Sequence, residues 1–118
     1  MKVKKHKIRL TGVVEVIKEH LALYRQLHAE TWPEVLAAIK EANFTNYSIH
    51  CQKINDCGYF LFSYMEYAGD NLAEDSKKLA DKAVIQKWWS VCKPCLKPVN
   101  TTSIEQCWTP LEEVFYTE

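Results

Sequence analysis

The first patterned segment of the chain is residues 8–16, where apolar and polar side chains alternate. Strict alternation is typical of a β-strand that packs one face on a core. From Ile17 to Ala29 the apolar residues instead recur every three or four positions, which predicts an α-helix. The residue before a proline is disfavoured in the helical region, so the pattern must break at Trp32-Pro33.

A second helix is predicted from Pro33 to Glu41, with a stop at Asn43. Pro33 suits a first helical turn, and Thr31 with Glu34 has the spacing of a capping box. This spacing predicts that the Thr31 hydroxyl caps the second helix.

Two strands follow, over residues 45–53 and 59–67, and a turn rich in Asn, Asp and Gly joins them. This spacing predicts an antiparallel hairpin. The first of the two strands alternates, with Tyr47 facing inward, whereas residues 59–67 are apolar on both faces. A strand that is apolar on both faces is expected to be buried from both sides.

Helical spacing returns from Asp70 to Pro94, residues 100–110 are a predicted loop, and residues 111–116 are a predicted last strand. The order β-α-β-β-α-β predicts an α+β, ferredoxin-like fold, in which both helical regions cover one face of an antiparallel four-stranded sheet. The other face carries large rings and needs a cover, so we predict a homodimer through the sheet face. The length favours one domain over residues 1–118.

The charge balance, the apolar runs and the cysteine count limit the kinds of partner and location that are expected. The chain has 15 basic and 15 acidic residues, which gives no field that would attract nucleic acid or a membrane. No apolar run is long enough to span a bilayer, and no signal peptide opens the sequence. The five cysteines are an odd number, which favours free thiols in a cytoplasmic protein.

Candidate chemistry centres on Tyr24 and His28, which lie one helical turn apart on the apolar stripe. His28 is near the end of its helix, where the helix dipole is expected to favour the imidazolium form. On the residues alone, a histidine on such a face is more often a hydrogen-bonded core residue than a catalyst, and inward tyrosines such as Tyr47 are more often core than site.

Two sequence pairs are ambiguous. Trp88 and Trp89 point about 100° apart on a helix, so one can pack in the core while the other forms a wall for the C–H face of a sugar. The residues alone favour packing of both tryptophans.

Cys92 and Cys95 form a CxxC, a spacing found in redox pairs and in halves of zinc sites. No second pair accompanies them, so accidental thiols are the better interpretation.

Together these residues resemble a known family, the L-rhamnose mutarotases, which are small dimeric α/β-barrel proteins. The matching segments run in order from about residue 8 to the end of the chain: Tyr24-x-x-x-His28, Trp32-Pro33-Glu34, Asn46-Tyr47-Ser48-Ile49, Leu61-Phe62-Ser63-Tyr64-Met65-Glu66, Trp88-Trp89 and Glu113-Val114-Phe115-Tyr116.

The resemblance implies a homodimeric isomerase that interconverts the α and β anomers of a free monosaccharide without metal or organic cofactor. It places the family's acid on His28, its sugar-contacting tyrosines on Tyr24 and Tyr47, and its tryptophan pair on Trp88 and Trp89. L-rhamnose is the first expected substrate, and L-fucose, another 6-deoxy sugar, is the second.

Two segments depart from the family pattern, residues 50–52 (His-Cys-Gln) and the loop 94–110, and both are expected to border the sugar. In the expected mechanism, His28 protonates the ring oxygen while Tyr47 or Tyr24 assists at the anomeric hydroxyl. The competing functions on the same scaffold are a cofactor-free monooxygenase, a haem-handling protein and a non-catalytic sugar-binding dimer.

Overall fold

The computed structural model describes residues 7–100 and 107–118. The elements along the chain are β1 (Ile8–Val16), the 3-10 turn η1 (Lys18–His20), α1 (Leu21–Ala29), α2 (Pro33–Glu41), β2 (Phe44–Ile54), β3 (Gly58–Tyr67), α3 (Leu72–Ala80), α4 (Ala83–Cys92), the 3-10 turn η2 (Lys93–Cys95), β4 (Leu96–Lys97) and β5 (Thr109–Pro110).

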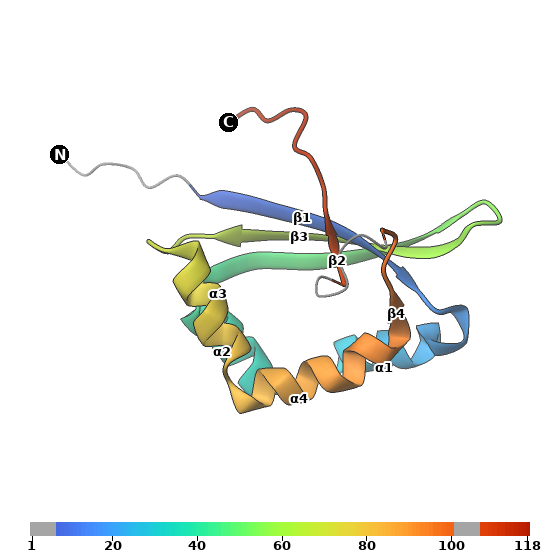
Figure 1. The fold of residues 1–118 in the computed structure, drawn as a ribbon, viewed down its shortest axis with the longest axis horizontal. Coiled ribbons are helices and arrows are strands. Elements are labelled where there is room, and N and C mark those ends of the chain that lie inside the picture. Colours follow the sequence, from blue (N-terminus) through green and yellow to red (C-terminus); the bar gives the residue numbers. More distant parts are fainter. Residues whose placement is uncertain (1–6, 101–106) are drawn as a thin grey trace.

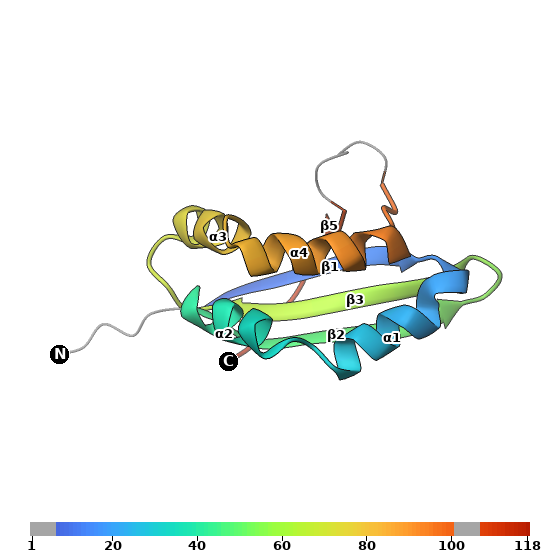
Figure 2. The same cartoon turned by 90° about the horizontal axis from the view of Figure 1, so that it is seen from below.

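The strands form one antiparallel sheet in the order β2-β3-β1-β4, and β5 also pairs with β1. All four helices lie on the same face of this sheet (Figure 1). Seen through the helices, α3 and α4 form one row and α1 and α2 a second (Figure 2). The α+β, ferredoxin-like prediction is therefore confirmed. No helix of the described segments is long and apolar enough to cross a membrane.

The strand β2 contains an irregularity that simple alternation did not predict. Its pairing with β3 shifts register between Thr45 and Ser48, and Asn46 has a φ of 50°. Such a bulge inserts one extra residue, which resets the inward and outward alternation. As a result, Phe44 packs against Tyr67 with ring centroids 5.3 Å apart, and Tyr47 also faces the helices.

The predicted capping box at the start of α2 is wrong. The cap residue of α2 is Trp32, without a side-chain hydrogen bond, and the Thr31 hydroxyl instead donates to the carbonyl of His28 at 3.0 Å. A carbonyl in the last turn of a helix has no partner within the helix, so Thr31 satisfies α1 rather than α2.

The end of the chain also differs from the prediction. The region 70–94 is split into α3 and α4 by a turn, and no strand forms over 111–116. The sheet edge is instead made by the two short strands β4 and β5, after which Arg9 holds the last residues through Glu113 at 2.6 Å and the ring of Tyr116. Residues 101–106 of the predicted loop lie outside the described residues.

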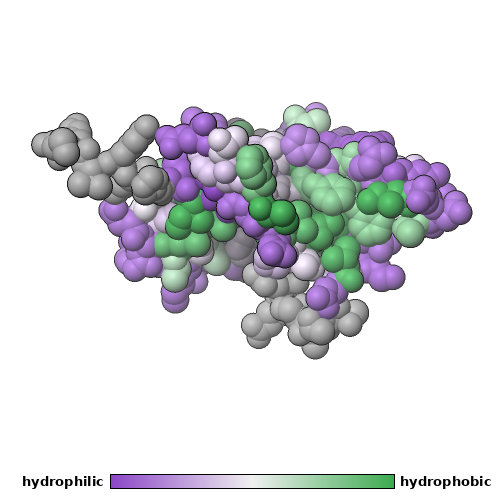
Figure 3. All heavy atoms as spheres, turned by 90° about the horizontal axis from the view of Figure 1, so that it is seen from above, coloured by the Kyte–Doolittle hydropathy of each residue, from purple (hydrophilic) through white to green (hydrophobic). Residues whose placement is uncertain are grey.

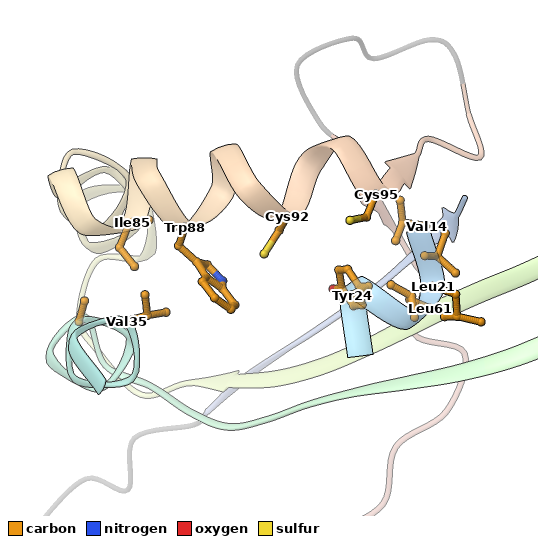
Figure 4. Packing of buried hydrophobic residues seen from close by; sticks show 11 residues of the cluster. Val14, Leu21, Tyr24, Val35, Leu61, Ile85, Trp88, Cys92 and Cys95 are labelled. Carbon is orange, nitrogen blue, oxygen red and sulfur yellow. The ribbon is translucent and has the colours of Figure 1, made fainter. Parts of the chain in front are cut away.

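The core lies between the helices and the sheet. Val14 on β1 and Leu61 on β3 are buried cross-strand partners, and Val35 on α2 and Ile85 on α4 are each 1% exposed. Figure 4 shows Ile85 pointing from α4 toward Val35 on α2. This contact joins the two rows of helices.

Replacing Ile85 with alanine is expected to lower the free energy of unfolding by about 2–5 kcal/mol, because the change leaves a void in a closely packed contact. Chemical denaturation followed by circular dichroism measures the loss. Val91→Ala, on the more exposed side of the same helix, is the control and is expected to change stability by less than about 0.5 kcal/mol. Equal effects of the two substitutions would contradict the assignment of Ile85 to the core.

Candidate active site

A cavity of about 490 Å³ opens between the sheet and the helices. This volume lies within the range of small-molecule sites. The strands supply its floor, α1 and α4 its walls, and the segment after α4 its rim; the lining residues are Leu10, Thr11, Gly12, Tyr24, His28, Tyr47, Ser63, Met65, Trp88, Trp89, Cys92, Lys93, Leu96, Cys107, Trp108 and Pro110.

All five site residues expected from the sequence line this cavity: Tyr24, His28, Tyr47, Trp88 and Trp89. The first two are one turn apart on α1, the third is turned inward by the bulge in β2, and the tryptophans come from α4. In Figure 4, Trp88 and Cys92 extend from α4 into the space that Tyr24 enters from α1.

The imidazole of His28 is fixed by three contacts. Its Nδ1 lies 3.0 Å from the backbone carbonyl of Tyr24, the ring of Tyr24 stacks on it with centroids 4.1 Å apart, and Trp88 meets it edge-on at 5.3 Å. A carbonyl only accepts hydrogen bonds, so Nδ1 must carry the proton. The lone pair of the neutral ring is therefore on Nε2, for which no partner is found among the described residues.

Burial lowers the pKa of His28, and the hydrogen bond to Tyr24 opposes this shift without cancelling it. The expectation that the helix end favours imidazolium is therefore wrong. The ring is half-buried among aromatic neighbours, so the loss of hydration has the largest effect on its pKa. His28 is neutral at rest near pH 7.

The two tyrosines of the cavity keep their protons. Burial raises the pKa of both Tyr24 and Tyr47. As whole residues, Tyr24 is 5% exposed and Tyr47 is 42% exposed. Both phenols are thus neutral groups that can donate a hydrogen bond to a ligand in the cavity.

The tryptophans divide their roles as the helical geometry suggested. Trp88 is 7% exposed and packs in the core, where its ring meets Trp32 at 5.1 Å. Trp89 is half-buried and forms a second aromatic wall, with the Lys93 ammonium 5.6 Å from its ring centroid. Together they form flat apolar surfaces of the kind on which the C–H faces of a sugar pack.

Several lining residues were not predicted individually. Trp108 belongs to the loop 94–110, and its type and position could have marked it as a further wall. Lys93 was considered only as part of the CxxC. The described part of the loop does border the cavity, whereas residues 50–52 are exposed and outside the lining, so that expectation is wrong.

The two cysteines of the CxxC carry no reactive thiolate at rest. Cys92 and Cys95 are buried and unbridged, and burial raises the pKa of Cys92 to about 12 and also raises that of Cys95. A thiol with a raised pKa is a poor nucleophile. Within the described residues, no group of three or more His, Cys, Asp or Glu side chains has the geometry of a metal site.

The family model for L-rhamnose mutarotase matches residues 9–117 of this chain. An L-rhamnose mutarotase of Oceanobacillus iheyensis is 36% identical over 93 residues, which cover 79% of this chain and 82% of the relative. The crystal structure of an L-rhamnose mutarotase from Formosa agariphila matches with a TM-score of 0.70 and 28% identity, over 94% of this chain and 99% of that one.

A second structural match is a protein described as an antibiotic biosynthesis monooxygenase from Nitrosomonas europaea. It has a TM-score of 0.56 and 10% identity over the whole length of both chains. At this identity the likeness shows a shared fold alone.

Proposed function

The chain belongs to the L-rhamnose mutarotase family, and on this premise we propose that it is an isomerase that interconverts the α and β anomers of L-rhamnose. The observation that supports this most directly is a neutral, oriented imidazole in a cavity lined by indole and phenol rings. Charged groups are scarce in this lining, which suits a neutral ligand with apolar faces and many hydroxyls.

The reaction opens the pyranose ring and closes it again on the other face of the aldehyde. Opening removes the proton of the anomeric hydroxyl and delivers one to the ring oxygen. Both oxygens are bonded to the same carbon, so one imidazole can serve both. Nε2 of His28 first accepts the anomeric proton and then, as imidazolium, protonates the ring oxygen. The proton count is unchanged and no covalent intermediate forms.

In this sequence of proton transfers His28 still acts as the acid at the ring oxygen, as expected from the resemblance. It must act as a base first, because its lowered pKa leaves the resting imidazole neutral. Tyr24 is suited to hold the imidazole, because its ring and carbonyl both contact it. Tyr47 is suited to donate a hydrogen bond to the sugar, because it lines the cavity and its phenol keeps its proton. Trp88 and Trp89 pack on the sugar ring.

The alternative functions receive less support. The relatives' names mention only L-rhamnose, so L-fucose as substrate stays a prediction. The location in the cytoplasm also stays a prediction. The monooxygenase alternative rests on the fold alone. A sugar-binding dimer without catalysis is separated from an enzyme by the rate of anomer exchange.

His28→Ala is expected to lower the catalysed rate of anomer exchange by about 10²–10⁴-fold, because proton transfer by a positioned group contributes that much. Magnetisation transfer between the anomeric proton signals of L-rhamnose measures the rate. His20→Ala, which removes an exposed histidine from the turn η1, is the control and should leave the rate unchanged. A parental rate in the His28 variant would disprove the assignment.

The pH dependence tests the resting state of His28. We expect the enzyme-dependent rate to be constant at neutral pH and to fall as the pH drops through a value below about 6.5, because protonation removes the Nε2 lone pair. The rate without enzyme must be subtracted at each pH. If the enzyme-dependent rate instead rises toward acid pH, the resting group is an acid and the base-first order is wrong.

We also propose that a second copy of the chain covers the outer face of the sheet. Phe60, Phe62 and Tyr64 lie on this face only partly buried, and Val114 and Phe115 of the last segment are 88% and 79% exposed. Figure 3 looks onto this side and shows hydrophobic side chains gathered between polar ends. Contiguous apolar surface of this kind marks an interaction site.

The assembly is testable by molar mass. Light scattering of the eluted protein should give twice the chain mass of 13.8 kDa. Phe62→Glu is expected to shift the protein to the monomer, since it places a charge in the apolar face. Leu36→Glu, on an exposed position of α2, should leave the mass unchanged. A monomeric parent protein would rule out the dimer.

A further inference from the structure

The floor of the cavity is formed by two neighbouring pairs of residues on the central strands. Leu10 of β1 faces Met65 of β3, and Gly12 faces Ser63. All four residues line the cavity. We call them the cavity floor.

The strands close the floor at both ends. The next pair in one direction is Val14 with Leu61, and both are buried in the core. In the other direction Ile8 is opposite Tyr67, whose side chain is 1% exposed. The helix-facing side chains of β1 and β3 therefore border the cavity at these two pairs, which lie about 7 Å apart along the strands, a distance that one hexopyranose spans.

The two pairs differ in chemistry. Leu10 and Met65 offer only hydrocarbon and a thioether. Beside them, Ser63 carries a hydroxyl for which no hydrogen bond is found within the described part of the chain. The floor thus has an apolar half and a polar half, although the helix-facing positions on either side of it are filled by large apolar side chains.

Gly12 keeps the polar half open. Its φ is not positive, so the backbone of β1 does not itself require glycine. A Cβ atom at this position would lie 3.2 Å from the Ser63 hydroxyl oxygen, 3.5 Å from the Thr109 carbonyl oxygen and 3.6 Å from the Cβ of Trp108. The missing side chain therefore leaves a notch the size of a methyl group, bordered by the Ser63 hydroxyl, the Thr109 carbonyl and Trp108.

We infer that the cavity floor sets the orientation and the specificity of the sugar: the Gly12–Ser63 notch receives a ring hydroxyl, and the Leu10–Met65 pair receives the C6 methyl group. This inference rests on the proposed function, since it concerns the same cavity. A 6-deoxy sugar matches both halves at once. L-mannose, which is L-rhamnose with a hydroxyl on C6, places that hydroxyl on Leu10 and Met65, where it has no partner.

The test measures binding of L-rhamnose and L-mannose by calorimetry and anomer exchange by magnetisation transfer. For Gly12→Ala we expect kcat/KM and affinity for L-rhamnose to fall about 10–200-fold, because a methyl group fills the notch. Ser63→Ala, which removes the hydroxyl without filling the notch, should weaken binding as well. Thermal unfolding checks that each variant is folded.

A second pair of variants tests the apolar half independently of Gly12. Met65→Gln is nearly isosteric but polar, and it should lower the preference for L-rhamnose over L-mannose about tenfold. Met65→Leu is the matched control and should keep the parental preference. The inference is overturned if Gly12→Ala binds as the parent does, or if Met65→Gln and Met65→Leu give the same preference.

The two proposals fail in different ways. If the parent binds L-rhamnose without accelerating anomer exchange, the proposed function is wrong. The floor inference is then still tested by the affinities of the variants and by their preference for L-rhamnose over L-mannose. If the parent binds neither sugar, the floor inference is overturned too. If the parent is active but the floor variants keep the parental affinity for L-rhamnose and the parental preference over L-mannose, the proposed function stands and only the floor inference is wrong.

Discussion

The hydrogen bond from Nδ1–H of His28 to the carbonyl of Tyr24 is the interaction on which the candidate chemistry depends. It uses one imidazole nitrogen for orientation and leaves the other for the ligand. Stacking on Tyr24 and burial beside Trp88 then keep the ring neutral. The Thr31 hydroxyl stabilises the same turn by donating a hydrogen bond to the carbonyl of His28. The side chain of His28 is therefore held by Tyr24, and its backbone carbonyl is held by Thr31.

The second constraint is that helices can cover only one face of a four-stranded sheet. On that face the two rows of helices contact each other where Val35 meets Ile85, while the sheet and helices leave a cavity farther along. The same arrangement leaves apolar side chains on the outer face. The site and the proposed dimer interface are thus two consequences of one layered architecture.

Most of the fold could be predicted from the sequence because β1 and β3 have strong, regular patterns and pair with each other over their whole length. The bulge in β2 was missed because alternation on either side of Asn46 looks continuous in sequence. The last strand was misplaced because apolar spacing over 111–116 does not reveal whether a strand has a partner. The five site residues do share one cavity, but the charge of His28 was predicted wrongly, since burial depends on residues distant in sequence.

All four tryptophans of the chain gather at the cavity: three line it, and Trp32 contacts one of these three edge-on. The intrinsic fluorescence of the protein therefore originates around the candidate site. Trp88 is also in contact with the imidazole of His28, whose charged form quenches indole emission. The molecule thus carries its own optical reporter, which responds to an occupant of the cavity and to the protonation of its central residue without any added label.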